Sequence, residues 1–376
     1  MTVLITGGAG FIGSWLVESL LAVGDRVVVL DNLSPQIHGT NPDCDVPWLD
    51  ATRGVTFVRG DIRDAGLVDS LLSEVEAVVH LAAETGTGQS MYQIGHYYSV
   101  NVQATAQLFE AIGTRHRHVK HVVLASSRSI YGEGAYRLGK QLVVPAPRDA
   151  KRMAAGLWEP LGPNGEALEL VATPESARPR PASVYAATKL ANEQLGRVFA
   201  EAYGTSVTAL RLQNVYGERQ SLRNPYTGIL SIFSNRMRKA MPINIFEDGL
   251  ESRDFVHVSD VVRSIELSMK HAGGGYRVFN IGSGVPTTVI EMARALARTL
   301  KSSSELQISG DFRAGDIRHC YADRTRARAE LGFEPLISLE EGLSAFCGWV
   351  VRQEVVEDLS DQAQRELSRL GLGKAS

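Results

Sequence analysis

Residues 2–13, TVLITGGAGFIG, decide the fold of this chain. The apolar run at residues 3–5 is typical of a short buried strand, and the pattern that begins at Phe11 predicts an amphipathic helix. Between them stand three glycines with GxxGxxG spacing, Gly7, Gly10 and Gly13. Such glycines permit a tight turn, a close approach of the backbone to a pyrophosphate, and close packing of helix on strand. Because the free N–H groups of a helix N-terminus favour anions, this stretch predicts a site for nucleotide phosphates.

A second apolar run, residues 27–30, ends in an acid, Asp31. An aspartate at such a point can be an ordinary helix N-cap or turn residue. After the glycine turn, however, it stands where the ribose of a dinucleotide would lie. A carboxylate accepts a hydrogen bond from the ribose 2′-OH and repels a 2′-phosphate, so Asp31 predicts NAD rather than NADP.

Length and composition indicate an ordinary globular protein. The 376 residues are enough for two domains, and 44% apolar with 22% charged residues argues against wholesale disorder. The net charge of −3 gives no reason to expect nucleic acid or a membrane surface as a partner. No apolar run reaches membrane-spanning length, and the chain begins with a core strand rather than a signal peptide. We therefore expect a cytoplasmic protein.

Cysteine and histidine usage predicts no metal centre. The three cysteines, Cys44, Cys320 and Cys347, are scattered along the chain, so they indicate neither a disulfide framework nor a metal site. The histidines form no HExxH motif.

Further apolar runs at 55–58, 77–81 and 119–125 alternate with helical patterns. The five strands predict an α/β fold with a doubly wound parallel sheet, which binds ligands at the carboxyl ends of its strands. The residues at these ends are candidates for cofactor binding: Asp61, Ile62, Leu81, Ala82, Ala83, Ser126 and Ser127. Asp61 is placed to hold an adenine amino group, or alternatively to cap the next helix.

The helix after the fourth strand carries one polar residue on its apolar face. Ala104, Leu108 and Ala111 have helical spacing and indicate core packing. Asn101 shares this surface, and a buried amide normally has a specific partner. Asn101 is therefore a further candidate.

Residues 183–189, SVYAATK, open a predicted helix that runs to about residue 203. Tyr185 and Lys189 are four residues apart and share one face of it. An ammonium beside a phenol stabilises the phenolate and lowers a pKa of about 10 toward working pH. The pair then forms a general base that takes a proton from an alcohol while hydride leaves its carbon. YxxxK alone is a weak signal, but after a cofactor-binding fold it is a strong one.

The remaining chain is less regular. Residues 132–181 are rich in Pro, Gly, Arg and Glu, and we interpret them as an insertion that covers the active-site mouth or makes a subunit contact. Helices are expected after Pro225 and Gly228, after Ser259 and Asp260, and after a capping box at Thr288 and Glu291. Arg313 and Arg318, close to Asp316, can clamp a diphosphate; the alternative is a solvated charge patch.

We expect a cofactor-binding domain at residues 1–212, with the chain returning to it at 254–285. A smaller α/β substrate-binding lobe is expected at 213–253 and 286–350, and a charged, peripheral tail at 351–376.

Many ordered motifs together resemble one family. They are TGGAGFIG, Asp31, Asp61–Ile62, Leu81–Ala82–Ala83, Asn101, Ser126–Ser127 with Tyr131–Gly132, YAATK, Asn214, RDFVHVSD and FNIGSG. Over residues 1 to about 345 the chain looks like the extended short-chain dehydrogenases/reductases, and within them the NAD-dependent nucleotide-sugar epimerases and dehydratases.

The resemblance implies a catalytic group and two binding sets. Ser127 would hydrogen-bond the reacting hydroxyl, Tyr185 would exchange its proton, and Lys189 would hold the nicotinamide ribose. The cofactor set is Gly7, Gly10, Phe11, Ile12, Gly13, Asp31, Asn32, Asp61, Ile62, Leu81, Ala82, Ala83, Asn101, Ser126, Tyr185 and Lys189. The substrate set is Thr85, Ser127, Tyr185, Asn214, Arg253, Arg313 and Asp316. The family also implies tight retention of NAD and a homodimer formed through two long helices from each monomer.

The residues beside Ser127 distinguish epimerisation from dehydration. In the dehydratases this motif is TDE, and its two acids expel water from the sugar; here the matching residues are Ser127, Arg128 and Ser129. Without these carboxyls the elimination lacks its acid and base, so 4-epimerisation is predicted.

Five phrases resemble the dTDP-L-rhamnose 4-epimerase group of the family: SPQIHG (34–39), GQSMYQI (88–94), SSRSIYGEG (126–134), NPYTGILSIF (224–233) and IFEDG (245–249). The substrate would then be a dTDP-6-deoxyhexose. The alternatives are a 4-epimerase of another UDP-, GDP- or dTDP-sugar, a 4-ketosugar reductase or sugar dehydrogenase, and a non-catalytic NAD-binding regulator.

Overall fold

The computed structural model describes residues 1–39, 54–224, 226, 228–271, 273–313, 316–356 and 360–374. Cys44, Pro225 and Gly315 lie outside these residues, and so does the side chain of Arg313. In the described part of the chain, no helix combines the length and the apolar character needed to cross a bilayer.

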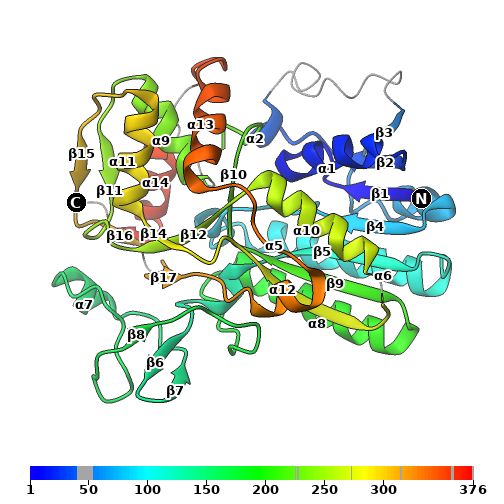
Figure 1. The fold of residues 1–376 in the computed structure, drawn as a ribbon, viewed down its shortest axis with the longest axis horizontal. Helices are drawn as coiled ribbons and strands as arrows, with labels where there is room; N and C mark the ends of the chain where they lie inside the picture. The colour runs from blue at the N-terminus through cyan, green and yellow to red at the C-terminus, as the bar shows by residue number, and fades with distance from the viewer. Residues whose placement is uncertain are drawn as a thin grey trace.

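Seven parallel strands form the central sheet, in the spatial order β13-β9-β5-β4-β1-β2-β3 (Figure 1). Their bounds are β1 Thr2–Thr6, β2 Arg26–Asp31, β3 Val55–Arg59, β4 Ala77–His80, β5 His121–Ser127, β9 Ser206–Leu212 and β13 Tyr276–Ile281. The chain winds outward from β1 to β3 and then crosses to the other side of β1 at β4. This order confirms the predicted doubly wound sheet, and its crossover leaves a crevice at the carboxyl edge between β1 and β4.

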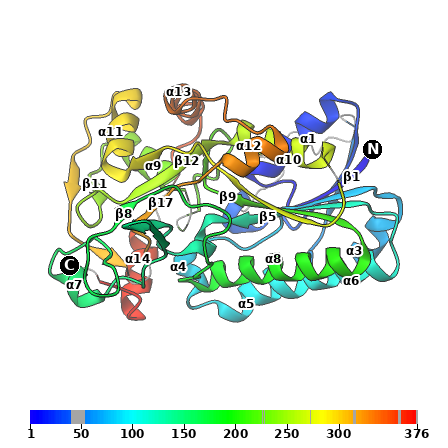
Figure 2. The same ribbon diagram turned by 60° about the horizontal axis from the view of Figure 1, so that its bottom comes forward.

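Helices cover both faces of the sheet (Figure 2). One face carries α1 Phe11–Ala22, α10 Val258–Lys270 and α12 Thr325–Leu331. The other carries α3 Ala65–Leu71, α6 Ala104–Thr114 and α8 Val184–Tyr203. Because successive strand residues point to opposite faces, Val3 and Ile5 pack into the first core and Leu4 packs into the second.

Short elements connect these units. They are α2 Pro35–His38, the 3-10 turn η4 Leu72–Glu74, α4 Thr87–Ser90, α5 Ile94–Tyr98, the π-helical turn η5 Ser99–Gln103 and the 3-10 turn η6 Arg128–Tyr131. The helix predicted around Asn101 is thus one run, 94–114, with a π-helical turn at Asn101 itself. Such turns are frequent at functional sites.

A second group of elements packs beside the carboxyl edge of the sheet, upper left in Figure 1. Its helices are α9 Ile229–Arg238, α11 Val289–Leu300 and α13 Leu339–Val350, which share a core around Phe233, Met292 and Phe346. Its short strands are β10 Asn214–Tyr216, β12 Ser252–His257, β14 Pro286–Thr288 and β17 His319–Cys320, with the pair β11 Ile243–Ile245 and β15 Leu306–Ile308. The predicted capping box of Thr288 and Glu291 is confirmed at the start of α11.

The insertion at residues 132–181 folds into a small layer of its own, at the lower left of Figure 1. Three antiparallel strands form it, β6 Tyr136–Leu138, β7 Gln141–Val143 and β8 Glu169–Leu170, with the short helix α7 Ala150–Ala154. Thr173 ties it to the chain that follows β17, because its N–H donates to the carbonyl of Tyr321 at 2.9 Å.

The predicted cap of α10 was wrong. His257, the last residue of β12, is the N-cap and its side chain accepts from the N–H of Ser259. Asp260 instead accepts hydrogen bonds from the N–H groups of Leu336 and Ile337, at 2.8 and 3.1 Å. The buried acid therefore fixes a distant loop, which its sequence position does not reveal.

The expectation of a peripheral C-terminal tail was wrong for the helix α14, Ser360–Arg369. Ala363 and Leu367 are buried. After α14, the strand β18, Gly373–Lys374, pairs with β16, Phe312–Arg313, in antiparallel fashion. The apolar residues of α14 are few but four apart, so they form one narrow stripe that the charged composition conceals.

Candidate active site

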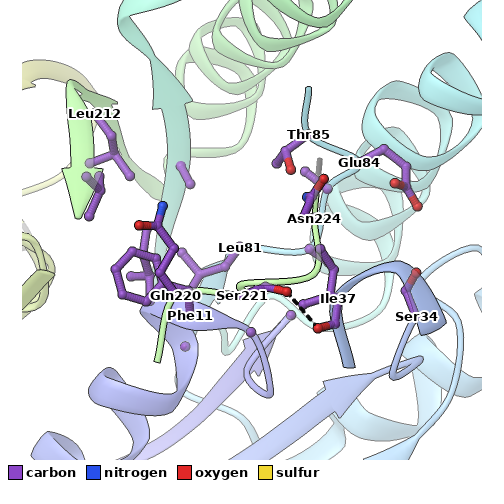
Figure 3. A pocket seen from close by; sticks show the side chains of 18 of the residues that line it. Phe11, Ser34, Ile37, Leu81, Glu84, Thr85, Leu212, Gln220, Ser221 and Asn224 are labelled. Atoms are coloured by element: carbon purple, nitrogen blue, oxygen red, sulfur yellow. Dashed lines mark hydrogen bonds between the residues drawn. The ribbon is translucent and has the colours of Figure 1, made fainter. Parts of the chain in front are cut away.

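A cavity of about 400 Å³ lies at the carboxyl edge of the sheet (Figure 3). Most residues predicted for cofactor and substrate line it: Gly7, Gly10, Phe11, Ile12, Gly13, Asp31, Asn32, Asp61, Ile62, Leu81, Ala82, Ala83, Thr85, Ser126, Ser127, Tyr185, Lys189 and Asn214. The sequence places these residues in seven separate segments, and the parallel sheet brings the segments together at one edge.

The glycine turn forms one end of this cavity. Gly7 has a φ of +71°, and a Cβ there would stand 2.6 Å from the backbone nitrogen of Ala82. A Cβ on Gly13 would stand 2.5 Å from the Cα of Gly8. Both positions therefore require glycine.

Helix α1 begins at this turn without a side-chain cap. Gly10 is its N-cap, and the first turn contains no acidic residue. The N–H groups at the N-terminus of a helix lack intrahelical partners, and their positive end favours an anion. The cradle therefore fits the pyrophosphate of a dinucleotide.

Asp31 is fixed at the end of β2 by two backbone groups. Its Oδ2 accepts from the N–H of Ala9 at 3.0 Å, and its Oδ1 accepts from the N–H of Leu33 at 2.9 Å. A carboxylate has about four acceptor sites, so the two that remain can receive ribose hydroxyl groups. The geometry supports the predicted preference for NAD.

We expect Asp31→Ala to weaken NAD binding far more than NADP binding. A hydrogen bond to a charged group contributes about 1.5–3 kcal/mol, which corresponds to a rise in Kd of about 10- to 150-fold. Calorimetric titration of both dinucleotides measures the two changes. Asp69→Ala, which removes an acid of α3 that pairs with Arg115 and His116 outside the cavity, is the matched control. Equal losses for the two dinucleotides would contradict the assigned role.

Asp61 lines the cavity but already has a partner. Its carboxylate accepts from the Nε and Nη2 of Arg63 at 2.9 and 2.7 Å, and these hydrogen bonds lower the pKa of Asp61. The alternative role as a helix cap is wrong, because Asp64 caps α3 by accepting from the N–H of Leu67 at 3.0 Å.

Asn101 lies behind the cavity wall and does not line the cavity. Its Nδ2 donates to the carbonyl of Glu84 and to the Oγ1 of Thr188, at 3.1 and 3.0 Å. Its Oδ1 accepts from the N–H of Glu84 at 2.8 Å. The amide thus has the specific partners that its burial required, and it ties the cavity-lining Glu84 to α8 instead of facing the cofactor.

Ser127, Tyr185 and Lys189 meet at the centre of the cavity. Ser183 caps α8 by accepting from the N–H of Ala186 at 3.2 Å, and this sets the direction of the first turn. The Nζ of Lys189 lies 5.8 Å from the centre of the Tyr185 ring and donates to the carbonyl of Ala125 at 2.9 Å. Ser127, at the end of β5, hydrogen-bonds the Tyr185 phenol.

Burial shapes the proton chemistry of this group. It raises the pKa of Tyr185, while the hydrogen bond from Ser127 and the charge of Arg128 act in the opposite direction. Burial also lowers the pKa of Lys189 to about 8. At neutral pH the ammonium thus remains charged, but the predicted lowering of the Tyr185 pKa is not found in this structure, because burial outweighs the groups that favour the phenolate. The placement of phenol, ammonium and Ser127 is still the one needed to exchange a proton with a bound alcohol.

The residues predicted for the substrate separate into two groups. Thr85 and Asn214 line the cavity with Ser127 and Tyr185. Arg253 lies outside it, and its Nη1 donates to the carbonyls of Ser252 and Arg318. Asp316 lines a small separate pocket of about 20 Å³ under the insertion.

Both readings of Arg318 were wrong. Its side chain is 1% exposed, so it is no solvated patch. It is also unavailable to a diphosphate, because its guanidinium pairs with Glu159, Glu247 and Asp248 at 2.7 to 3.0 Å.

Gln213 and Arg128, at or beside the site, have buried polar atoms without a partner among the described residues, and Gln213 carries no signal in local sequence. Gln213 lines the cavity, and both of its side-chain polar atoms are buried with no partner among the described residues. Arg128 has an equally unpartnered Nη1, and burial lowers its pKa to about 10. A ligand can satisfy such groups, whereas an empty apolar environment leaves them costly. Among the residues that the structure describes, no group of three His, Cys, Asp or Glu side chains is placed to hold a metal ion.

Comparisons with known proteins agree with this geometry. Residues 3–149 and 160–282 match the model of the NAD dependent epimerase/dehydratase family. A dTDP-L-rhamnose 4-epimerase of Burkholderia thailandensis is 40% identical over 93% of this chain and 95% of its own. A UDP-glucose 4-epimerase of Mycolicibacterium smegmatis is 34% identical over 92% and 96% of the two chains.

Solved structures show the same fold. The UDP-glucose 4-epimerase of Thermotoga maritima with UDP-glucose is 31% identical, with a TM-score of 0.76 over 94% of this chain and 99% of its own. MoeE5 in complex with UDP-glucuronic acid and NAD is 33% identical, with a TM-score of 0.74 over the same shares. The chain therefore belongs to the NAD-dependent epimerase/dehydratase family of extended short-chain dehydrogenases/reductases, and within it to the nucleotide-sugar 4-epimerases.

Proposed function

We propose that this enzyme interconverts dTDP-L-rhamnose and dTDP-6-deoxy-L-talose by epimerisation at C4. The observation that carries the proposal is the meeting of Ser127, Tyr185 and Lys189 in the cofactor cavity, with Arg128 and Ser129 where a dehydratase would need acids. The 40% identity to a dTDP-L-rhamnose 4-epimerase supports the choice of sugar.

The residues of this chain divide the work as follows. The glycine turn and the N-terminus of α1 hold the pyrophosphate of NAD, and Asp31 holds a ribose. Bound NAD supplies the hydride acceptor and donor at the sugar carbon. Tyr185, as phenolate, takes the proton of the C4 hydroxyl, while Ser127 orients that hydroxyl and the ammonium of Lys189 stabilises the phenolate.

The return step uses the same groups. After the 4-keto sugar has turned over, Tyr185 gives back its proton and the alcohol forms with inverted configuration. No net oxidation occurs, so one bound NAD serves many turnovers. Thr85 and Asn214 line the cavity beside the catalytic group and are proposed to contact the sugar nucleotide in both orientations. The roles expected for Arg253, Arg313 and Asp316 toward the sugar nucleotide remain predictions.

The test is an assay without added cofactor. Purified enzyme is mixed with dTDP-L-rhamnose, and the proton signal at C4 is followed by NMR together with absorbance of NADH. We expect the talose epimer to accumulate to a fixed ratio with no build-up of NADH. Stoichiometric NADH would instead indicate a dehydrogenase. Turnover of UDP- or GDP-sugars but not of dTDP-L-rhamnose would reassign the substrate, and no turnover of any sugar would favour a non-catalytic regulator.

We also propose a homodimer built on α5 and α8, which lie side by side at one face of the molecule (Figure 2). Four apolar side chains on these helices are exposed, Ile94, Tyr98, Val198 and Tyr203. A dimer through this face would remove these side chains from water, which favours association. Sedimentation equilibrium tests the proposal, which predicts twice the mass of the chain.

A further inference from the structure

Three residues far apart in the sequence meet beside the cofactor cavity. Gln36 lies in α2, Gln89 lies in α4, and Asn224 follows β10. The two glutamines form a reciprocal amide pair: Nε2 of Gln89 donates to Oε1 of Gln36 at 2.9 Å, and Nε2 of Gln36 donates to Oε1 of Gln89 at 3.2 Å. Gln36 also donates to the Oδ1 of Asn224, at 3.4 Å.

A second link runs parallel to this pair. The hydroxyl of Ser221 donates to the carbonyl of Ile37 at 2.9 Å, shown as the dashed line in Figure 3. Ile37 and Ser221 line the cofactor cavity on one side. They also line a second cavity of about 420 Å³ on the other side, which shares Gly10 and Phe11 with the first. The Ile37–Ser221 contact is thus part of a thin wall between two open spaces at the glycine turn.

The two sides of the amide pair are anchored differently. Gln89 is buried, and its Oε1 also accepts from the hydroxyl of Tyr97 at 3.1 Å. The next residue, Ser90, accepts from the backbone N–H of Tyr185 at 3.0 Å, so α4 is joined to the catalytic helix. Gln89 therefore belongs to the rigid side of the cavity.

Gln36 belongs to a short loop after β2. The loop contains a helix of only four residues, α2, and is bounded by two residues with positive φ, Leu33 at +52° and Gly39 at +75°. Its cavity-lining residues are Ser34, Ile37 and His38. Loop-end residues that tolerate unusual φ and ψ angles are typical hinge positions. The links to Gln89 and Ser221 join this loop to segments on other sides of the cavity.

We propose that the Gln36–Gln89 pair, with Ser221, is a closure that retains NAD. The loop 34–39 would open for cofactor exchange and remain shut during sugar turnover. Gln36 and Gln89 are positioning residues in this scheme, because they act through the loop and not by touching the reacting atoms. The inference rests on the NAD site alone and is independent of which sugar is epimerised.

The experiment measures exchange of NAD. Enzyme loaded with radiolabelled NAD is mixed with a large excess of unlabelled NAD, and the label that remains bound is followed over time. Gln36→Met and Gln89→Met keep the side-chain volume and remove the amides. Each variant loses the two neutral hydrogen bonds of the pair and one more, to Asn224 from Gln36 or from Tyr97 to Gln89. Release should become about tenfold faster in each variant, with an unchanged melting temperature of the cofactor-saturated enzyme.

The double variant makes the test specific. Because each single substitution already breaks the shared pair, release from Gln36→Met/Gln89→Met should be much slower than the product of the two single effects would give. Gln141→Met, at an exposed position in β7, is the matched control and should release NAD at the wild-type rate. Wild-type release from both single variants overturns the closure. So do effects that multiply in the double variant, since they would indicate two separate contacts. Either result leaves the epimerase proposal intact, because no sugar enters the measurement.

Discussion

Tyr185→Phe is expected to lower the epimerisation rate by about 10²- to 10⁴-fold, the range that general acid–base groups contribute. The substitution removes the only atom that can exchange a proton with the C4 hydroxyl in the proposed mechanism, and it leaves the ring in place. The rate is measured by NMR at C4 with saturating sugar. The content of bound NAD, measured after denaturing the purified enzyme, should not change.

Two further variants locate the effect. Ser127→Ala removes a hydrogen-bond donor to the same hydroxyl and should cost less than Tyr185→Phe, since the proton acceptor remains. Tyr92→Phe removes a phenol that is bonded to Tyr226 at 2.9 Å, outside the catalytic group, and should leave the rate unchanged. If Tyr185→Phe turned over at the wild-type rate, the phenol would have no part in the mechanism. Loss of NAD from that variant would show instead that the tyrosine mainly holds the cofactor.

The features of this site that the sequence predicts are those set by the spacing of residues within one helix, strand or turn. Gly7, Gly10 and Gly13 define a turn within seven residues, and Tyr185 and Lys189 define one helix face within five. Asp31 is predicted from its position at the end of an apolar strand. In each case the chemistry needs only the spacing along one element, and the parallel sheet then brings the elements together.

The rest depends on partners that are distant in sequence. Gln36 meets Gln89 and Asn224 across separations of 53 and 188 residues, and no periodic pattern links them. Asn101 was correctly expected to have a specific partner, but its position behind the wall depends on how α8 packs. The stripe of α14 was missed because its two buried residues stand among charges.

Arg318 shows why the burial and the partners of a charged residue cannot be predicted from the sequence around it. Its partners Glu159 and Glu247 are 159 and 71 residues away, one in the insertion and one in the segment before β12. Arg148 in the insertion pairs with Glu247 as well, at 2.7 Å, and donates to the carbonyl of Asp316 at 2.8 Å. The two arginines thus join the insertion to the segment that carries Asp316. A substrate role for that segment would depend on this ionic cluster of Arg148, Arg318, Glu159 and Glu247.

Arg318→Met is accordingly expected to lower the free energy of unfolding by about 3–5 kcal/mol, the cost of leaving buried charges without their partner. Glu247 is 4% exposed and would keep only Arg148. Burial already raises the pKa of the neighbouring Glu251 to about 7, so water solvates charged carboxylates poorly in this cluster. Another unpaired carboxylate there would be costly. Urea unfolding followed by circular dichroism measures the change as a shift of the midpoint with an unchanged slope.

Arg326→Met supplies the comparison for that variant. Arg326 pairs with Glu330 at 2.8 Å one helical turn away, and the two side chains are 37% and 43% exposed. The guanidinium also lies 5.3 Å from the centre of the Phe279 ring. An exposed pair of this kind contributes only about 0.3–0.5 kcal/mol, so its loss should barely move the midpoint. The two variants remove the same charge and the same donors, and they differ in burial. A loss below about 1 kcal/mol in Arg318→Met would mean that water reaches the cluster and replaces the guanidinium. The insertion would then be held to the rest of the molecule by its apolar contacts, such as that between Trp158 and Phe312.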